Sequence, residues 1–238
     1  MSGRILLLRL EAPLMSFGSV LVDKRGPTDR HPGTALITGL LANALGWDHS
    51  EGGRIMRLQD RIRLASRIDR PGTELIDYQT AKLDGKDRAW TTAGKPTERS
   101  GSPDTYDGAA QRWRAYWAGA SVLAAVGLTG ESGPGDQPGI EDMAQALCWP
   151  DRPLFIGRKN CLPSQPIFAG ISETECLVGA LRDGITSPVE ARWPVEEGVP
   201  AGCRARQHVV HDMRNWVANV PAGSRIVCEG QLNPEISP

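Results

Sequence analysis

A long stretch without a hydrophobic pattern interrupts an otherwise ordinary globular sequence. Residues Lys82–Gln111 read KLDGKDRAWTTAGKPTERSGSPDTYDGAAQ and are rich in Gly, Thr, Ser, Asp and basic residues, with few large apolar ones. Compact domains rarely hold so long a loop without secondary structure. We therefore predict a disordered insertion or a projecting arm that becomes ordered on a partner, with a plain flexible loop as the alternative.

The composition of this stretch suggests what the partner is. Basic residues are interleaved with an aromatic side chain, Trp90. Positive charge neutralises a phosphate backbone and aromatic rings stack on bases, so the pattern is typical of single-stranded RNA binding. The basic residues of the predicted arm are Lys82, Lys86, Arg88, Lys95 and Arg99.

Strand and helix patterns flank the predicted arm. Ile5–Leu10 is a continuous apolar run, which indicates a central strand. The segment GTALITGLLANALG has helical periodicity, with Thr34 as the expected N-terminal cap and Gly46 at its C-terminal end. A short helix is expected at Ile140–Leu147, and a strand from Ala118 to Leu128.

The segment DRIRLASRID alternates as a strand does, with apolar side chains on one face and Arg61, Arg63 and Arg67 on the other. Two interpretations of the basic face stay open, a solvated sheet surface and a phosphate contact. LIDYQTA is predicted to be a further short strand, and others are expected around Ile185–Trp193 and Gln207–Val210.

Composition narrows the class of protein. The chain has 238 residues, 40% hydrophobic and 23% charged, which is typical of a soluble globular protein, and we expect a cytoplasmic location. Five cysteines without a CxxC pair argue against a disulfide framework or a zinc site. Residues 1–118 hold 18 Lys and Arg against 14 Asp and Glu, whereas residues 119–238 hold 9 against 14, so the basic charge lies in the first half.

Five segments occur in an order that resembles a known family: ILLLRLEAPLMSFGS, GPTDRHPGTALITGLLANALGW, IDYQTA, RWRAYWAGASVLAAVGL and LFIGRKNCLPSQPIFAG. Over about residues 3–170 the chain resembles the CasD family of RAMP-type subunits of the type I-E CRISPR Cascade complex. The resemblance implies an α+β fold. Residues 1–170 would form a ferredoxin-like (RRM-related) domain with a long β-hairpin thumb at 82–111, and residues 171–238 a small, irregular β-rich part completing the same domain.

The resemblance also implies a function. The expected role is a non-catalytic RNA-binding subunit that grips the 5′ handle of the CRISPR RNA (crRNA) and caps the backbone filament. Its neighbours would be the terminal backbone subunit and the large subunit, with target DNA reached only through the complex and with no cofactor, metal or membrane. The RNA-binding residues it implies are Ser16, Phe17, Gly18, Arg25, Arg30, Lys82, Arg88, Lys95, Arg99, Arg112, Gly157, Arg158, Lys159 and Asn160.

Within this set, the run GRKN combines a glycine with two strong donors. Gly157 would let backbone amides approach a phosphate closely, while Arg158 and Lys159 donate hydrogen bonds. The alternative is that the two basic residues pair with acidic neighbours.

A second function stays open, a metal-independent endoribonuclease that processes CRISPR precursor RNA, as subunits of the related type I-C systems do. RNA cleavage needs a base beside the 2′-hydroxyl. The predicted arm contains no histidine, and Gln79 stands where the family usually has one. Both features favour the non-catalytic scaffold. Two further departures are Phe17, where relatives carry tryptophan, and Thr34, where they carry Arg or Lys.

Overall fold

The structure is a computed structural model that describes residues 3–19, 23–82, 109–130, 138–174 and 176–234. Most of the predicted arm, with Arg88, Lys95 and Arg99, lies outside the described residues. The expected α+β fold class is confirmed, because helices pack on both faces of a large antiparallel sheet.

The centre of the molecule is a ferredoxin-like unit, with elements in the order β-α-β-β-α-β. Its strands neighbour one another in the order β8-β1-β7-β4, and each neighbouring pair is antiparallel. The six elements in chain order are β1 (Ile5–Glu11), α1 (Thr34–Ala44), β4 (Ile62–Arg70), β7 (Ser121–Leu128), α3 (Ile140–Cys148) and β8 (Phe168–Ser172).

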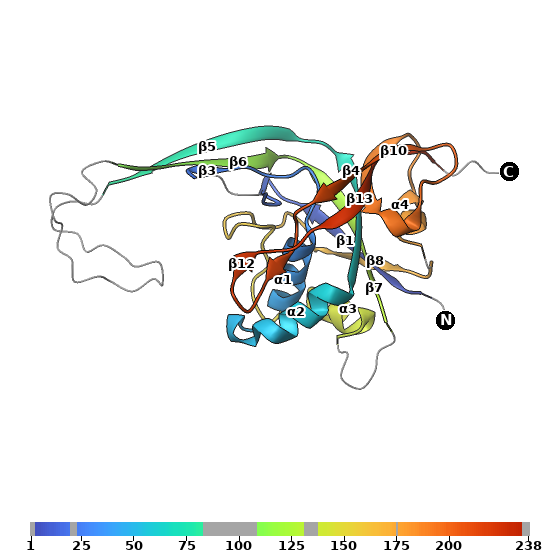
Figure 1. Cartoon of the computed structure of the whole chain (residues 1–238), viewed down its shortest axis with the longest axis horizontal. Coiled ribbons are helices and arrows are strands. Elements are labelled where there is room, and N and C mark those ends of the chain that lie inside the picture. Colours follow the sequence, from blue (N-terminus) through green and yellow to red (C-terminus); the bar gives the residue numbers. More distant parts are fainter. Residues whose placement is uncertain (1–2, 20–22, 83–108, 131–137, 175, 235–238) are drawn as a thin grey trace.

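A two-stranded ribbon is inserted between β4 and β7 and extends away from the body (Figure 1). It consists of β5 (Thr73–Ala81) and β6 (Ala110–Ala118), which pair continuously from Thr73 opposite Ala118 to Ala81 opposite Ala110. The single strand expected from Ala118 to Leu128 is therefore wrong at its start. Gly119, with φ of +65°, ends β6, and RWRAYW lies in the ribbon, where Tyr116 is also part of the core.

The last third of the chain widens the same sheet at the β4 edge. Strands β9 (Val189–Pro194), β13 (Arg225–Leu232) and β10 (Arg204–Val210) continue the order from β4 outwards. The remaining elements are β2 (Leu14–Met15), β3 (Arg25–Gly26), η1 (His49–Glu51), α2 (Gly52–Arg61), α4 (Leu177–Arg182), η2 (Val195–Glu197), β11 (Arg214–Asn215) and β12 (Val220–Pro221).

The sheet has a hydrophobic core on each face, because its central strands are apolar on both sides. Leu6, Leu8 and Leu10 of β1 pack with α1, α2 and α3, whereas Ile5 packs with α4 on the opposite face. Successive residues of a strand point to opposite faces of the sheet, so one strand supplies side chains to both cores.

The second core overturns both interpretations of the predicted arginine face at Arg67, and Arg61 does not belong to this face because it ends α2. Arg67 is only 7% exposed and donates hydrogen bonds to the carbonyl oxygens of Leu181 and Asp183 at the end of α4. Arg63 forms an ion pair with Glu197. At Arg67 this face is neither solvated nor free for phosphate, because α4 covers it, whereas the Arg63 side chain stays 32% exposed beside η2.

The helix α1 ends as expected but begins differently. Gly46 has φ of +72° and lies just beyond the C-terminal end. At the other end Gly33 is the N-cap and Thr34 is the first helical residue, so the predicted cap is wrong. The carboxylate of Asp212 instead accepts hydrogen bonds from the Thr34 amide (3.0 Å) and hydroxyl (3.3 Å). A distant residue satisfies the free N-terminal amide, which local sequence cannot reveal.

Candidate nucleic-acid interface

Several of the expected site residues come together at the base of the β5–β6 ribbon. Strand β2 pairs with the body end of β6, where Met15 lies opposite Trp117. Strand β3 runs along the free edge of β6, with Arg25 opposite Trp113. The loop Gly157–Asn160 reaches the same place through side-chain contacts. Two nearby strands from the start of the chain and a distant loop at 157–160 therefore meet at β6.

Gly157 allows the Gly157–Asn160 loop to pass close to the backbone of the first loop, by which we mean residues 16–19 after β2. Its φ is +89°, and a Cβ atom at this position would lie 1.6 Å from the Ser16 carbonyl oxygen. The Ser16 amide donates a hydrogen bond to the carbonyl oxygen of Ile156 (3.3 Å). The expected role of Gly157 is to let backbone amides approach a phosphate. In the structure Gly157 lets the loop backbone approach the backbone at Ser16, because no side chain fits between the two segments.

Arg158 ties the loop to the ribbon. Its guanidinium donates hydrogen bonds to the carbonyl oxygens of Ala115 (3.0 Å) and Gly26 (3.3 Å) and lies 4.5 Å from the centre of the Tyr116 ring. Lys159 is exposed. Neither side chain forms an ion pair with any acidic residue in the described ranges, so the expected alternative of acidic partners is wrong there.

The first loop contributes backbone more than side chains. Ser16 and Phe17 are 2% and 5% exposed, and the Phe17 amide donates a hydrogen bond to the Thr28 hydroxyl (2.9 Å). Gly18 is exposed, with φ of +76° and open space where a Cβ would be. Asn160 is exposed and its amide donates to the Tyr116 hydroxyl (3.4 Å).

The ribbon presents two chemically different faces. Successive strand residues point to opposite sides, so Arg112, Arg114 and Tyr116 share one face with the Arg158 guanidinium. Trp113 and Trp117 lie on the other face, where Trp113 is 5.0 Å from the Tyr78 ring. One face carries Arg112 and Arg114, with Asp77 opposite Arg114, and the other carries the Tyr78 and Trp113 rings. Positive charge and aromatic rings are what a single-stranded polyanion with bases can use.

The basic side chains on and around the ribbon differ from those of the body in how many form ion pairs with acidic residues. Most body arginines have an acidic partner, as Arg70 has in Glu11 (2.9 Å). Arg30 pairs with Glu190 (2.8 Å) and lies 5.3 Å from the Trp117 ring. By contrast, seven cations on or beside the ribbon form no ion pair with any residue that the structure describes: Lys24, Arg25, Lys82, Arg112, Arg114, Arg158 and Lys159.

A buried ion-pair network holds the first loop against the C-terminal strands. Arg192, on β9, donates hydrogen bonds to Asp29 (2.8 and 3.0 Å) and to Glu229 of β13 (2.9 and 2.6 Å). Burial alone would raise the pKa of Glu229, but hydrogen bonds from Arg206 and Arg192 lower it from 4.5 to about 2. Burial lowers the pKa of His31, whose Nδ1 lies 2.8 Å from the Ser66 hydroxyl. The network holds Asp29 in place, and the Asp29 amide donates a hydrogen bond to the Gly18 carbonyl oxygen (2.8 Å).

Sequence reasoning missed the faces of the ribbon. It did not select Tyr78, Trp113, Arg114 or Trp117. The alternation of arginine and tryptophan in RWRAYW is the period-two signal that could have found both faces. Lys82 stands at the end of the described part of the ribbon, away from its base.

Within the described residues there is no group of three or more His, Cys, Asp or Glu side chains that could hold a metal ion. Nor is any described helix long and apolar enough to cross a bilayer.

Comparisons with known proteins agree on one family. A family model described as Cas_Cas5d, CRISPR-associated protein (Cas_Cas5), matches residues 5–228. The CRISPR system Cascade subunit CasD of Escherichia coli (strain K12) is 29% identical over 168 residues, which are 69% of this chain and 70% of that protein.

Solved structures share the fold. A chain of a CRISPR RNA-guided surveillance complex matches with a TM-score of 0.72 and 21% identity, over 97% of this chain and 90% of that one. A structure described as a Cas protein matches with a TM-score of 0.61 and 26% identity, over 98% of this chain and 100% of that one.

Proposed function

The chain belongs to the Cas5 family of CRISPR-associated proteins, and from this premise we propose that it is a non-catalytic RNA-binding subunit of a type I-E CRISPR surveillance complex. It grips the 5′ handle of the crRNA and caps one end of the backbone filament, in the cytoplasm. The similarity to a Cascade subunit supports membership of such a complex. The partners are the terminal backbone subunit and the large subunit, and target DNA is met only through them.

The observation that carries the RNA-binding role is the set of unpaired cations around the ribbon. Clustered cations without acidic partners repel one another, and a polyanion relieves that repulsion while releasing its counterions. Arg112 and Arg114 supply this charge on one face of β6, and Lys159 supplies it on the adjoining loop. Arg158 supports the interface by holding the loop on the ribbon.

We also propose that residues 171–238 fold together with residues 1–170 as one domain. Strands β9, β13 and β10 extend the ferredoxin-like sheet rather than forming one of their own. The ion pair between Arg192 and Asp29 adds a buried link between the two parts.

The endoribonuclease alternative has less support. The relative with the Cascade name is described as a subunit and not as a nuclease. Among the described ribbon residues, 73–82 and 109–118, there is no histidine to act as a base, and Gln79 donates a hydrogen bond to Asp77 (2.5 Å). Incubating the protein with repeat RNA in the presence of a chelator tests this point, and specific cleavage would overturn the non-catalytic role.

Salt-dependent RNA binding tests the proposal directly. The double variant Arg112→Ala/Arg114→Ala should weaken binding of a single-stranded repeat RNA. It should also reduce the slope of log K against log salt by roughly 1.4, or about 0.7 for each lost phosphate contact. The matched control is Arg57→Ala/Arg204→Ala, which removes two exposed cations from α2 and β10. Equal slopes for the two double variants would contradict the proposal.

A further inference from the structure

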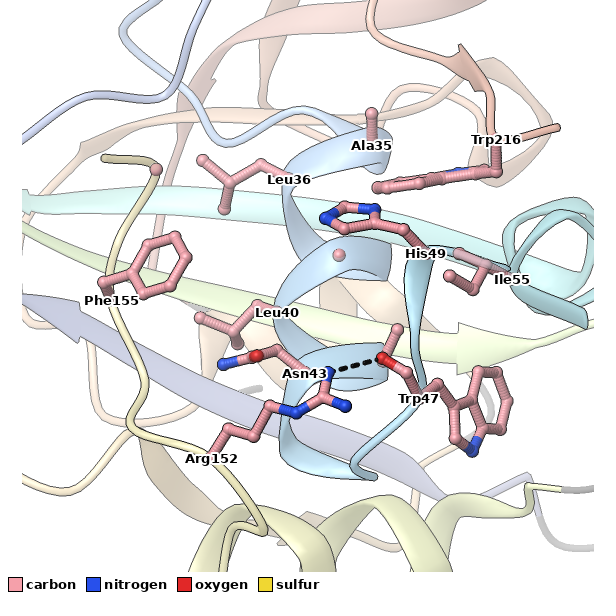
Figure 2. A pocket seen from close by; sticks show the side chains of 13 residues that line it. Ala35, Leu36, Leu40, Asn43, Trp47, His49, Ile55, Arg152, Phe155 and Trp216 are labelled. Atoms are coloured by element: carbon pink, nitrogen blue, oxygen red, sulfur yellow. Dashed lines mark hydrogen bonds between the residues drawn. The ribbon is translucent and has the colours of Figure 1, made fainter. Parts of the chain in front are cut away.

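A small hollow of about 250 Å³ lies beside α1, between η1, α2, the β11–β12 hairpin and the segment that follows α3. Figure 2 shows side chains from all these segments around it. Ligand pockets for drug-sized molecules hold about 300–1,000 Å³, so this one fits a single ring system. Most of its lining is apolar or aromatic, and the principal residues are Leu36, Leu40, Trp47, Ile55, Phe155 and Trp216.

Trp216 forms a rigid wall of the hollow. Its indole N–H donates a hydrogen bond to the side-chain oxygen of Gln59 (2.9 Å). A Cβ atom on Gly39 would lie 3.0 Å from the Trp216 ring, and one on Gly52 would lie 2.6 Å from its carbonyl oxygen. Gly39 thus leaves room for the indole against α1, and Gly52 leaves room for the Trp216 backbone against α2. In Figure 2 the ring is seen edge-on, with a flat face turned towards His49. Because the ring is already fixed, stacking on it costs little conformational entropy.

The Asn43 side chain leaves an acceptor available in the hollow. The Asn43 side-chain amide donates a hydrogen bond to the Pro153 carbonyl oxygen (2.9 Å). Its amide oxygen accepts no hydrogen bond from any described residue. Arg152 donates to the carbonyl oxygens of Trp47 (2.8 Å) and Gly46 (2.9 Å), so its position is fixed as well. A heterocyclic ring can stack one face on the Trp216 indole and donate a hydrogen bond from one edge to the Asn43 amide oxygen.

The hollow is continuous with the RNA-binding loop. Gly157 lines it and also begins the Gly157–Asn160 loop, whose Lys159 is exposed and unpaired within the described chain. A strand whose phosphate lies on Lys159 can therefore direct a neighbouring base past Gly157 into the hollow. Leu36 lies 3.5 Å from the position of a Gly157 Cβ, so a larger residue there would narrow the passage.

We propose that this hollow binds one unpaired RNA base, stacked on Trp216 with an edge hydrogen-bonded to the Asn43 amide oxygen. The inference rests on the proposed RNA-binding function and adds a base-specific subsite to it. A base with an exocyclic amino group can donate to the free amide oxygen, and one N–H of the Asn43 amide also stays available, because Pro153 accepts only the other.

The experiment combines an abasic scan with a change at Trp216. The full chain is titrated with a short single-stranded RNA of the repeat, and with versions that each lack one base. One position should weaken binding to the wild type by roughly 5- to 150-fold, as the loss of a stacked base does. Trp216→Leu should bind the intact RNA more weakly by a similar factor, with an unchanged salt slope. For this variant the abasic substitution at that position should have no further effect.

Trp149→Leu is the matched control, because Trp149 is 83% exposed and lies outside the hollow. It should bind like the wild type. Trp216→Phe keeps an aromatic face and should keep most of the affinity, which serves if the leucine variant does not fold. If the wild type binds no RNA, the proposed function itself fails. If it binds RNA but no abasic position couples to residue 216, the subsite is refuted, as it is if Trp216→Leu impairs only the association with partner subunits.

Discussion

Arg192 on β9 donates two hydrogen bonds to Asp29, 2.8 and 3.0 Å long, and so joins residues 163 positions apart in the chain. The arginine is 6% exposed and also holds Glu229. Through this contact the C-terminal strands hold Asp29, which precedes Arg30 and whose amide donates a hydrogen bond to the Gly18 carbonyl oxygen (2.8 Å). The proposed RNA interface therefore depends on a residue that does not belong to it.

Replacing Arg192 should destabilise the fold. Arg192→Met leaves Asp29 and Glu229 without their shared partner in a partly buried site, and the expected loss of unfolding free energy is about 3 kcal/mol. Urea unfolding measures this. Arg206→Met is the matched control, since Arg206 pairs with the same Glu229 but its side chain is 76% exposed, and the loss should stay below about 1 kcal/mol. Equal losses in the two variants would show that burial does not decide the strength of these pairs.

Acid should weaken the protein through Glu229. Its pKa falls from 4.5 to about 2 on folding, so its contribution is fully present above pH 4.5 and is lost as the pH falls towards 2. By pH 3 the loss should be about 2 kcal/mol. Urea unfolding at pH 6 and pH 3 should show a smaller pH dependence for Glu229→Gln than for the wild type. Identical pH profiles would exclude Glu229 as the source.

Gly157 should tolerate no side chain. In Gly157→Ala the new methyl group collides with the Ser16 carbonyl oxygen at 1.6 Å, so the two segments must separate, and we expect a loss of more than about 3 kcal/mol together with weaker RNA binding. Gly119→Ala is the control, with a similar φ of +65° but no atom within 4 Å of the new Cβ. It should cost only about 1 kcal/mol. A Gly157 variant as stable as the Gly119 variant would show that the crossing is loose.

Substitutions at Arg158 and Lys159 should have different effects, the first on stability and the second on RNA binding. Arg158→Ala removes the hydrogen bonds to Ala115 and Gly26, and it should lower the unfolding free energy by about 1–3 kcal/mol. Lys159→Ala should leave stability unchanged and reduce the salt slope of RNA binding by roughly 0.7. Thermal melting and RNA titration of each single variant distinguish these roles. The interpretation fails if Lys159→Ala is the less stable of the two.

The amino-acid sequence by itself determined the local elements and the chemical character of the chain. Apolar periodicity is a local property, so it correctly predicted β1, α1, β5 and α3. The composition around Lys82–Gln111 indicated an insertion, and two strands of a ribbon do lead into that stretch. The order of five segments identified the family, which the family model confirms over residues 5–228.

The tertiary structure alone decided which of those residues are available to a partner. Arg67 and Arg158 have the same charge as Arg112 and Lys159, yet the first two are used inside the fold. Sequence cannot separate them, because availability depends on carbonyl and carboxylate groups supplied by distant segments. Packing brings Asp212 to the start of α1 and Ser16 against Gly157 in the same way. A buried polar group must find a partner wherever the chain provides one, and only the folded chain shows which cations are left for RNA.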